Sequence, residues 1–138
     1  MTNSEIDEIL KTSRTIAVVG LSPKNDRPSY RVAEYLKDHG YRIFPVHPTA
    51  DEILGEPVYR RVEDIPEPID IVDVFRKSED TPPVAEAAVR AKAKVLWLQL
   101  GIENDVAASI AETAGLQVVQ NRCLKIEHER WQREGGQA

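Results

Sequence analysis

Short runs of apolar residues recur along the chain and alternate with longer stretches in which apolar residues stand three or four positions apart. The runs are four to seven residues long and rich in valine and isoleucine, which is typical of strands. Several are almost wholly apolar, as expected of parallel strands covered on both faces. They predict five strands, at Thr15–Leu21, Arg42–Val46, Ile69–Phe75, Val95–Leu100 and Leu116–Val119.

The stretches between these runs have the spacing of amphipathic helices. Val32, Ala33 and Leu36 fall on one face of a helix. Pro28 suits the first helical position, and Gly40 suits the stop. The same reasoning predicts further helices at about residues 4–11, behind Pro82 and Pro83, between a capping Asn104 and Gly115, and along the stripe of Leu124, His128 and Trp131.

Strands that alternate with helices over short links predict an α/β fold. We expect a Rossmann-like, doubly wound, parallel five-stranded sheet with helices on both faces. A chain of 138 residues suits a single domain, placed at residues 1–138 with its core at about 12–131. Residues 48–68 hold four prolines and interrupt the rhythm, so we expect a loop, a short extended piece and one helical turn there.

Composition narrows the class of partner. The net charge of −5 and the pI of about 5.2 disfavour nucleic acid and acidic membranes as partners, but not a small anion. Cys123 is the only cysteine, so no disulfide can form within the chain. The first residues lack the apolar core of a signal peptide, and no run reaches the roughly 18 apolar residues of a membrane span. We therefore expect a cytoplasmic protein.

Ligands of such sheets bind beyond the carboxyl ends of the strands, which directs attention to the turn after the first strand. Gly20 allows the backbone to approach a ligand closely, and Ser22 offers a hydroxyl. Lys24 and Arg27 add positive charge beside the N–H groups of a helix start. The turn therefore predicts a phosphate site.

A dinucleotide site of the NAD type does not fit the same residues. Ser22 stands where the second glycine of the G-x-G-x-x-G fingerprint belongs. The second strand ends at Val46 and His47, with no acid until Asp51 to hold the ribose hydroxyls. Basic neighbours instead favour a ribose that carries a phosphate. Together with a pyrophosphate this describes coenzyme A (CoA) or NADP.

Five segments of the chain then support a more specific hypothesis. In this order they resemble the small stand-alone CoA-binding proteins, whose domain is similar to the CoA-binding domain of the succinyl-CoA synthetase alpha subunit. The resemblance covers roughly residues 12–131. The segments are AVVGLSPKNDRPSYRVAEYLKDHGYRIFPVHP, LGEPVY, DIVDVFRKSE, WLQLGIEN and CLKIEH.

The resemblance implies a role in CoA binding for five groups of residues and makes CoA, free or acylated, the expected ligand. The chain departs from the family pattern at His47, commonly Asn, at Asn121, commonly Asp, and at Ala93, often Gly. The implied roles are the pyrophosphate for Gly20, Leu21, Ser22, Pro23 and Lys24; the helix start for Arg27, Ser29 and Tyr30; the adenosine for Val46, His47 and Pro48; the adenine side and a phosphate for Val74, Phe75 and Arg76; and the pantetheine arm for Gln99 and Gly101.

No catalytic constellation accompanies these residues, because Ser22 has no evident base and the histidines and Cys123 lack metal-ligand spacing. We therefore expect a non-catalytic CoA-binding protein. Two alternatives stay open. One is an NADP-binding oxidoreductase or its relic. The other is an interaction domain that senses redox or CoA status through Cys123, whose pKa a helix start and Arg122 would lower.

Overall fold

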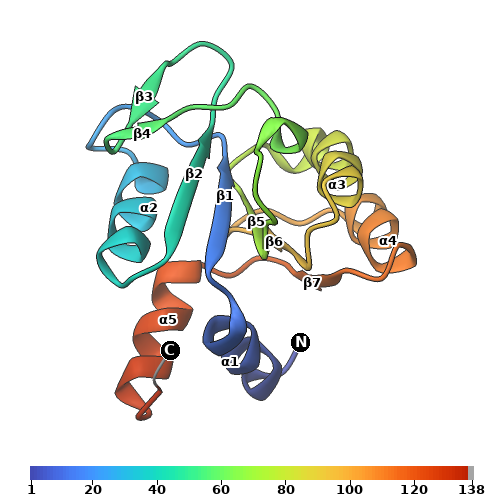
Figure 1. The fold of residues 1–138 in the computed structure, drawn as a ribbon. Helices are drawn as coiled ribbons and strands as arrows, with labels where there is room; N and C mark the ends of the chain where they lie inside the picture. Colours follow the sequence, from blue (N-terminus) through green and yellow to red (C-terminus); the bar gives the residue numbers. More distant parts are fainter. Residues whose placement is uncertain (137–138) are drawn as a thin grey trace.

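The computed structural model describes residues 1–136 and contains one parallel sheet in the order β2-β1-β5-β6-β7 (Figure 1). The chain runs from β1 outward to β2, then crosses to the other side of β1 and continues outward through β5, β6 and β7. The strand order therefore reverses beside β1, which is the switch point where such sheets bind ligands. The five strands are β1 (Thr15–Val19), β2 (Arg42–Val46), β5 (Ile71–Val74), β6 (Val95–Leu98) and β7 (Gln117–Val119).

Helices cover both faces of this sheet (Figure 1), which confirms the predicted fold class. One face carries α1 (Asn3–Thr12), α2 (Pro28–Asp38) and α5 (Leu124–Arg133). The opposite face carries α3 (Thr81–Arg90) and α4 (Asp105–Thr113). No helix among residues 1–136 combines the length and the apolar character needed to cross a bilayer.

The protein has two hydrophobic cores, one on each face of the sheet, and alternate residues of each strand contribute to them. In β1, Ile16 and Val18 pack under α1, α2 and α5, whereas Ala17 and Val19 pack under α3 and α4. All four are at most 4% exposed. Burial on both sides explains why the strand sequences are apolar without alternation.

The helix boundaries follow local signals in the sequence. Pro28 is the first residue of α2, and the Asn104 side chain caps α4 by accepting the Ala107 N–H at 2.8 Å, as predicted. Thr2 and Glu5 form a capping box at α1. The first residues of these helices therefore determine where the preceding turns end.

The proline-rich stretch, expected to hold a loop, one short extended piece and one helical turn, contains two short strands, which pair as a hairpin, and one helical turn. It consists of β3 (Glu52–Ile53), β4 (Glu56–Pro57) and a 3-10 turn, η1 (Val62–Asp64). Tyr59 then lies along the end of β2, donating its N–H to Pro45 and accepting that of His47. The hairpin and η1 thus reach the same sheet edge as the turn after β1. A second 3-10 turn, η2 (Ser78–Asp80), precedes α3.

Candidate ligand-binding site

The turn between β1 and α2 requires glycine at its first position. Gly20 has φ +83°, and its N–H donates to the Val46 carbonyl at 3.1 Å. A Cβ at this position would overlap the carbonyl oxygen of Phe75. The loops that follow β1 and β5 therefore approach each other as closely as a bare backbone permits.

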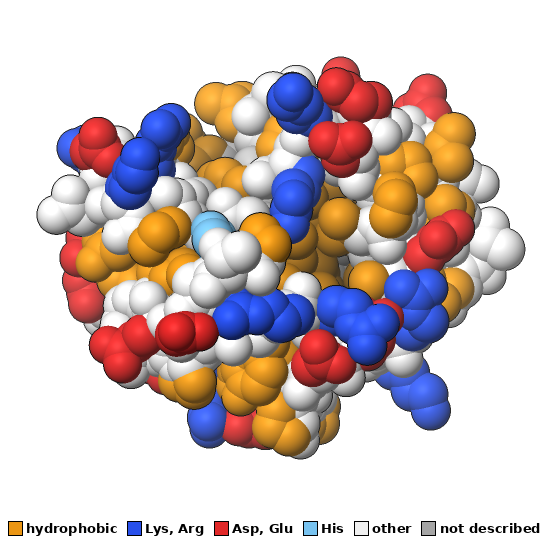
Figure 2. Space-filling view, turned by 90° about the horizontal axis from the view of Figure 1, so that it is seen from above, with side chains coloured by type: hydrophobic (Ala, Val, Ile, Leu, Met, Phe, Trp, Pro, Cys, Tyr) orange, Lys and Arg blue, Asp and Glu red, His pale blue; other side chains and the backbone are white. Residues whose placement is uncertain are grey.

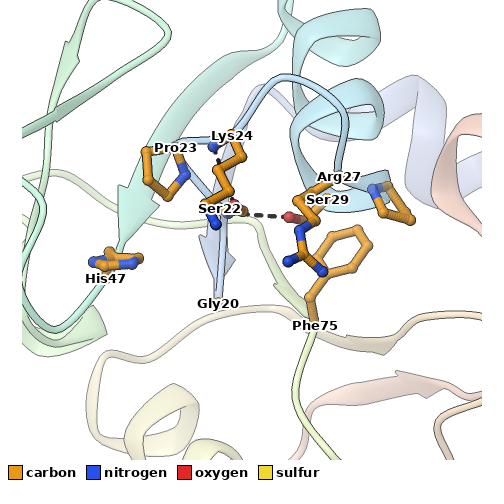
Figure 3. A pocket seen from close by; sticks show the side chains of 9 residues that line it. Gly20, Ser22, Pro23, Lys24, Arg27, Ser29, His47 and Phe75 are labelled. Carbon is orange, nitrogen blue, oxygen red and sulfur yellow. Dashed lines mark hydrogen bonds between the residues drawn. The ribbon is translucent and has the colours of Figure 1, made fainter.

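Hydrogen bonds close this turn onto the start of α2 (Figure 3). The Ser22 N–H donates to the buried Ser29 Oγ at 3.0 Å, and the Lys24 N–H donates to Ser22 Oγ at 3.1 Å. Both hydroxyls accept in these bonds, so each retains its O–H proton for a ligand. No side chain caps α2 at Arg27, which leaves the first N–H groups of the helix for an anion.

These residues surround a pocket of about 510 Å³, here called the turn pocket. That volume lies within the roughly 300–1,000 Å³ typical of small-molecule sites. Side chains from the turn, from the start of α2 and from the ends of β2 and β5 line it (Figure 3). Its lining residues are Gly20, Ser22, Pro23, Lys24, Arg27, Pro28, Ser29, His47 and Phe75.

The pocket edge is positively charged although the protein is acidic overall. Lys24 and Arg27 line the turn pocket, and Arg76 lies beside Gly20, where an added Cβ would come within 3.5 Å of its Nε. None of the three forms an ion pair within residues 1–136. In the view onto the carboxyl ends of the strands, Lys and Arg side chains lie around a depression that has apolar residues at its floor (Figure 2). Unpaired cations that converge in this way favour an anionic ligand.

His47 is held in place from two sides. Its Nδ1 accepts the N–H groups of Thr49 and Ala50 at 3.1 and 2.9 Å. Arg60 donates to the carbonyls of His47 and Ala50 and pairs with Asp51. With Nδ1 engaged as an acceptor, the proton of the neutral ring lies on Nε2, which leaves a donor at the turn pocket. An asparagine oxygen accepts such N–H groups equally well, so His47 preserves the turn expected from the usual Asn.

Half of the residues expected at the site are brought together in the turn pocket. Val46 and Arg76 line a groove next to it, on the α3 face of the sheet. Leu21 and Val74 are fully buried, and the buried Gln99 side chain donates to Asp73 at 2.6 Å. Tyr30, Pro48, Gln99 and Gly101 line neither of these sites, and the roles expected of all sixteen residues remain predictions.

Two contributors were not found from the sequence. Pro28 lines the turn pocket as well as starting α2. Arg60 fixes the loop that carries His47, but it lies in the proline-rich stretch, where no periodic pattern marks its position. Its contacts depend on the hairpin folding back along β2. The only available signal was a pair of adjacent arginines close to a strand end.

The lowered pKa of Cys123, on which one of the two alternative functions depended, is not found. The residue is half-buried at the start of α5, and burial raises the pKa of its thiol above the ordinary value. The N–H groups of Lys125 and Ile126 pull that pKa down, but burial outweighs them and the carboxyl of Asp73 adds to the rise. Arg122 pairs with Glu127 at 3.6 Å instead of activating the thiol. The position of Cys123 at a helix start predicted the nearby N–H groups that lower the thiol pKa, but it did not predict the burial that raises it.

The chain belongs to a family of CoA-binding domains. A family model described as a CoA binding domain matches residues 14–129, which is most of the chain. This confirms the resemblance seen in the sequence. The parallel sheet, the glycine turn after β1 and the family model therefore all indicate a CoA-binding domain.

Known relatives are of two kinds. An uncharacterized protein, YneT of Bacillus subtilis, is 45% identical over 125 residues, covering 91% of this chain and 93% of YneT. A solved hypothetical protein from Pyrococcus horikoshii superposes with a TM-score of 0.92 at 44% identity, covering 94% and 92% of the two chains. The ADP-forming acetate–CoA ligase of Methanocaldococcus jannaschii is 26% identical over 82% of this chain but only 17% of the ligase. The domain thus occurs at full length in small proteins and as a fraction of acyl-CoA ligases.

Proposed function

We propose that this protein binds CoA, with the diphosphate in the turn pocket and the adenosine across the ends of β2 and β5. One observation carries the proposal. Two unpaired cations, two serine hydroxyls and an uncapped helix start converge on one pocket, with Arg76 close beside it, in a chain of the CoA-binding domain family. The proposed activity is binding, and Gly20 serves it by letting the phosphates approach the backbone.

The groups around the turn pocket can serve different parts of the CoA phosphates. The Ser22 and Ser29 hydroxyls and the first N–H groups of α2 offer short, directional hydrogen bonds to phosphate oxygens. Lys24 and Arg27 neutralise their charge from the exposed side. Arg76, on the other side of Gly20, lies where a further phosphate on the ribose can be met. CoA carries both kinds of phosphate.

The test is a calorimetric titration of CoA into the Ser22→Ala/Lys24→Ala double variant. We expect a roughly 10- to 100-fold loss of affinity, because one hydroxyl donor and one cation are removed from the phosphate site. The control is Lys11→Ala/Ser109→Ala, which removes the same two side chains at exposed positions of α1 and α4.

The control should bind CoA like the wild type, and both variants should keep its unfolding midpoint within a few degrees, since they alter exposed or half-exposed side chains. Unchanged affinity in the Ser22→Ala/Lys24→Ala variant would place the phosphates elsewhere on the protein.

A further inference from the structure

Asp73 and Gln99 form a buried polar pair beneath the carboxyl ends of the strands. Asp73 lies in β5 and is fully buried, and Gln99, which follows β6, is 3% exposed. Asp73 Oδ1 lies 2.6 Å from Gln99 Nε2. The second carboxyl oxygen, Oδ2, is buried and has no partner within the described residues. The second amide atom of Gln99, Oε1, is not fully enclosed, so it reaches the surface at the strand ends.

The register of the sheet places Gln99 next to the turn pocket. Val74 lies opposite Leu98, so the next pair along the two strands is Phe75 and Gln99. The Gln99 N–H donates to the Val74 carbonyl at 3.3 Å, which holds the two strand ends together. Phe75 lines the turn pocket. A ligand that extends from this pocket along the strand ends toward β6 therefore meets the Gln99 amide.

The surroundings of Asp73 offer its charge no partner. Across the sheet it faces the apolar Val18 and Trp97. Burial therefore raises the pKa of its carboxyl to about 7. From α1 and α2, the same core receives Ile6, Ile9, Leu10, Val32, Ala33 and Leu36.

The titratable groups around this core do not bind Asp73 either. The Cys123 thiol at the start of α5 lies near enough for the Asp73 carboxyl to raise its pKa. Tyr41 donates to a backbone carbonyl of α1, Glu127 forms ion pairs with two arginines, and burial lowers the pKa of His128. Among the described residues, Gln99 is thus the one hydrogen-bond partner of Asp73.

The protonation state of Asp73 determines which end of the Gln99 amide it holds. A charged carboxyl only accepts hydrogen bonds, so it holds the NH2 group and leaves the amide oxygen at the surface, as the structure shows. A protonated carboxyl is a donor, and its proton finds an acceptor when the amide turns over and offers Oε1. The two ends of an amide have the same shape, and 2.6 Å also suits an O–H···O bond. The turn needs no repacking, and it brings the NH2 group to the surface.

We infer that Asp73 is a positioning residue for Gln99 and that a proton on Asp73 strengthens CoA binding, because Gln99 then presents its NH2 group to an acceptor oxygen of the ligand. CoA is rich in carbonyl and phosphate oxygens. It is also anionic, so it binds more tightly when no buried negative charge lies behind its site. Both effects favour the protonated state. The inference rests on the proposed function and adds its regulation by pH.

The experiment measures CoA affinity by calorimetry at pH 6 and pH 8. At pH 8 the free Asp73 carboxyl is about nine-tenths charged, so wild-type affinity should fall by roughly 10-fold more between the two pH values than that of Asp73→Asn. The Asn variant does not titrate at this position and always offers an NH2 group to Gln99 Oε1. The titrations of His47 and of the CoA phosphates are common to both proteins and cancel in the comparison.

Proton uptake is a second readout that a merely structural role would not produce. CoA titrations at pH 7.5 in two buffers of different ionisation enthalpy give the number of protons bound with the ligand. Wild-type protein should take up about half a proton more than Asp73→Asn, because CoA raises the pKa of Asp73 further.

Two further variants complete the test. Asp70→Asn is the matched control, because Asp70 precedes β5 at the opposite end of the sheet and bonds to Arg14 and Thr15. It should keep the wild-type pH dependence. Gln99→Met removes both ends of the amide and the hydrogen bond that lowers the Asp73 pKa, so it should bind CoA more weakly and without the additional loss at pH 8. Its comparison with the wild type needs no substitution at Asp73.

The outcomes separate the two claims. Equal pH dependence and equal proton uptake in wild-type protein and Asp73→Asn would overturn the role of Asp73, and CoA binding would stand. A loss at pH 8 that persists in Gln99→Met would overturn the role of Gln99. If wild-type protein binds CoA at neither pH, the proposed function fails and the inference fails with it.

Discussion

Asp73 is the residue whose chemistry departs furthest from its ordinary behaviour. It lies within β5, is fully buried and faces the core between the sheet and α1, α2 and α5. Its Oδ1 accepts from Gln99, but Oδ2 has no partner within the described residues. Burial raises the pKa of this carboxyl to about 7 and outweighs the Gln99 hydrogen bond, which acts to lower it. The side chain is therefore largely protonated below neutral pH.

This raised pKa predicts that Asp73 lowers the stability of the protein as pH increases. Between the unfolded pKa of 3.8 and the folded value of about 7, the folded state holds a proton that the unfolded state has lost. Stability therefore falls with rising pH through this window. Asp73→Asn should remove that decline, so the variant gains relative to the wild type between pH 5 and pH 8 in urea unfolding.

Asp70→Asn is the control at a nearby acid of opposite behaviour. Burial of Asp70 is outweighed by hydrogen bonds from the N–H groups of Arg14 and Thr15 and by Lys94, so its pKa is lowered. Its replacement should cost stability at neutral pH and less in acid. A wild-type pH slope in Asp73→Asn would contradict the account of Asp73.

The role of a single residue could be predicted where local backbone geometry determines it. It could not be predicted where it depends on groups that only the folded structure brings close. The glycine at position 20 was identified because a strand-to-helix turn needs a residue without a Cβ. His47 was recognised as lying at the ligand edge, but its tautomer depends on the N–H groups of Thr49 and Ala50, which only the folded turn brings to it. The pKa shifts of Asp73 and Cys123 require the burial of each group, which a local sequence does not contain.

At the scale of elements, α5 packs against α2 through a cluster of aromatic rings, of which Tyr41, His128 and Trp131 are buried and His39 is exposed. The Tyr35 hydroxyl lies 2.8 Å from His128 Nδ1, and the His39 ring stacks on Tyr35 at 4.0 Å. Tyr41 and Trp131 meet His128 edge-on. Burial, together with nearby His39, lowers the pKa of His128, so the ring is neutral at pH 7 and its Nδ1 can accept from Tyr35.

Removing this hydroxyl should weaken the contact between the two helices. Tyr35→Phe is expected to lower the free energy of unfolding by about 1 kcal/mol at pH 7.5, or more, since it leaves a buried imidazole nitrogen without a donor. Urea unfolding measures the change. Tyr59→Phe is the control, because the Tyr59 hydroxyl has no hydrogen-bond partner within residues 1–136. Equal effects in both variants would show that the Tyr35–His128 bond contributes nothing.

The elements themselves were largely predictable because periodicity and capping are local. The five apolar runs contain the five strands: Arg42–Val46 has the predicted bounds, and each of the other four strands is one to three residues shorter than its run, at one end or both. Pro28 and Asn104 marked helix starts correctly. The hairpin of β3 and β4 was expected only as one extended piece, because its two-residue strands are too short to show a period and depend on pairing with each other. The bridge from this stretch to β2 is made by Tyr59, which follows β4.

At the scale of the molecule, an acidic protein presents a basic edge. The net charge of −5 coexists with three unpaired cations around Gly20, because the sheet gathers strand ends that are far apart in the sequence. The sequence predicted this edge through the rule that ligands bind where parallel strands end. It did not separate the turn pocket from the groove on the α3 face of the sheet, which Val46 and Arg76 line, because that division depends on the face toward which each residue at a strand end points. Family membership accounts for the fold, and the proposed CoA binding depends on this basic edge.

The most direct test of CoA binding is a calorimetric titration of the wild-type protein, shown by mass spectrometry to be ligand-free, with CoA, dephospho-CoA, NADP and NAD. The account predicts that CoA binds, that dephospho-CoA binds more weakly because it lacks the ribose phosphate, and that NAD does not bind. Binding of NADP without CoA, or of none of the four, would contradict it.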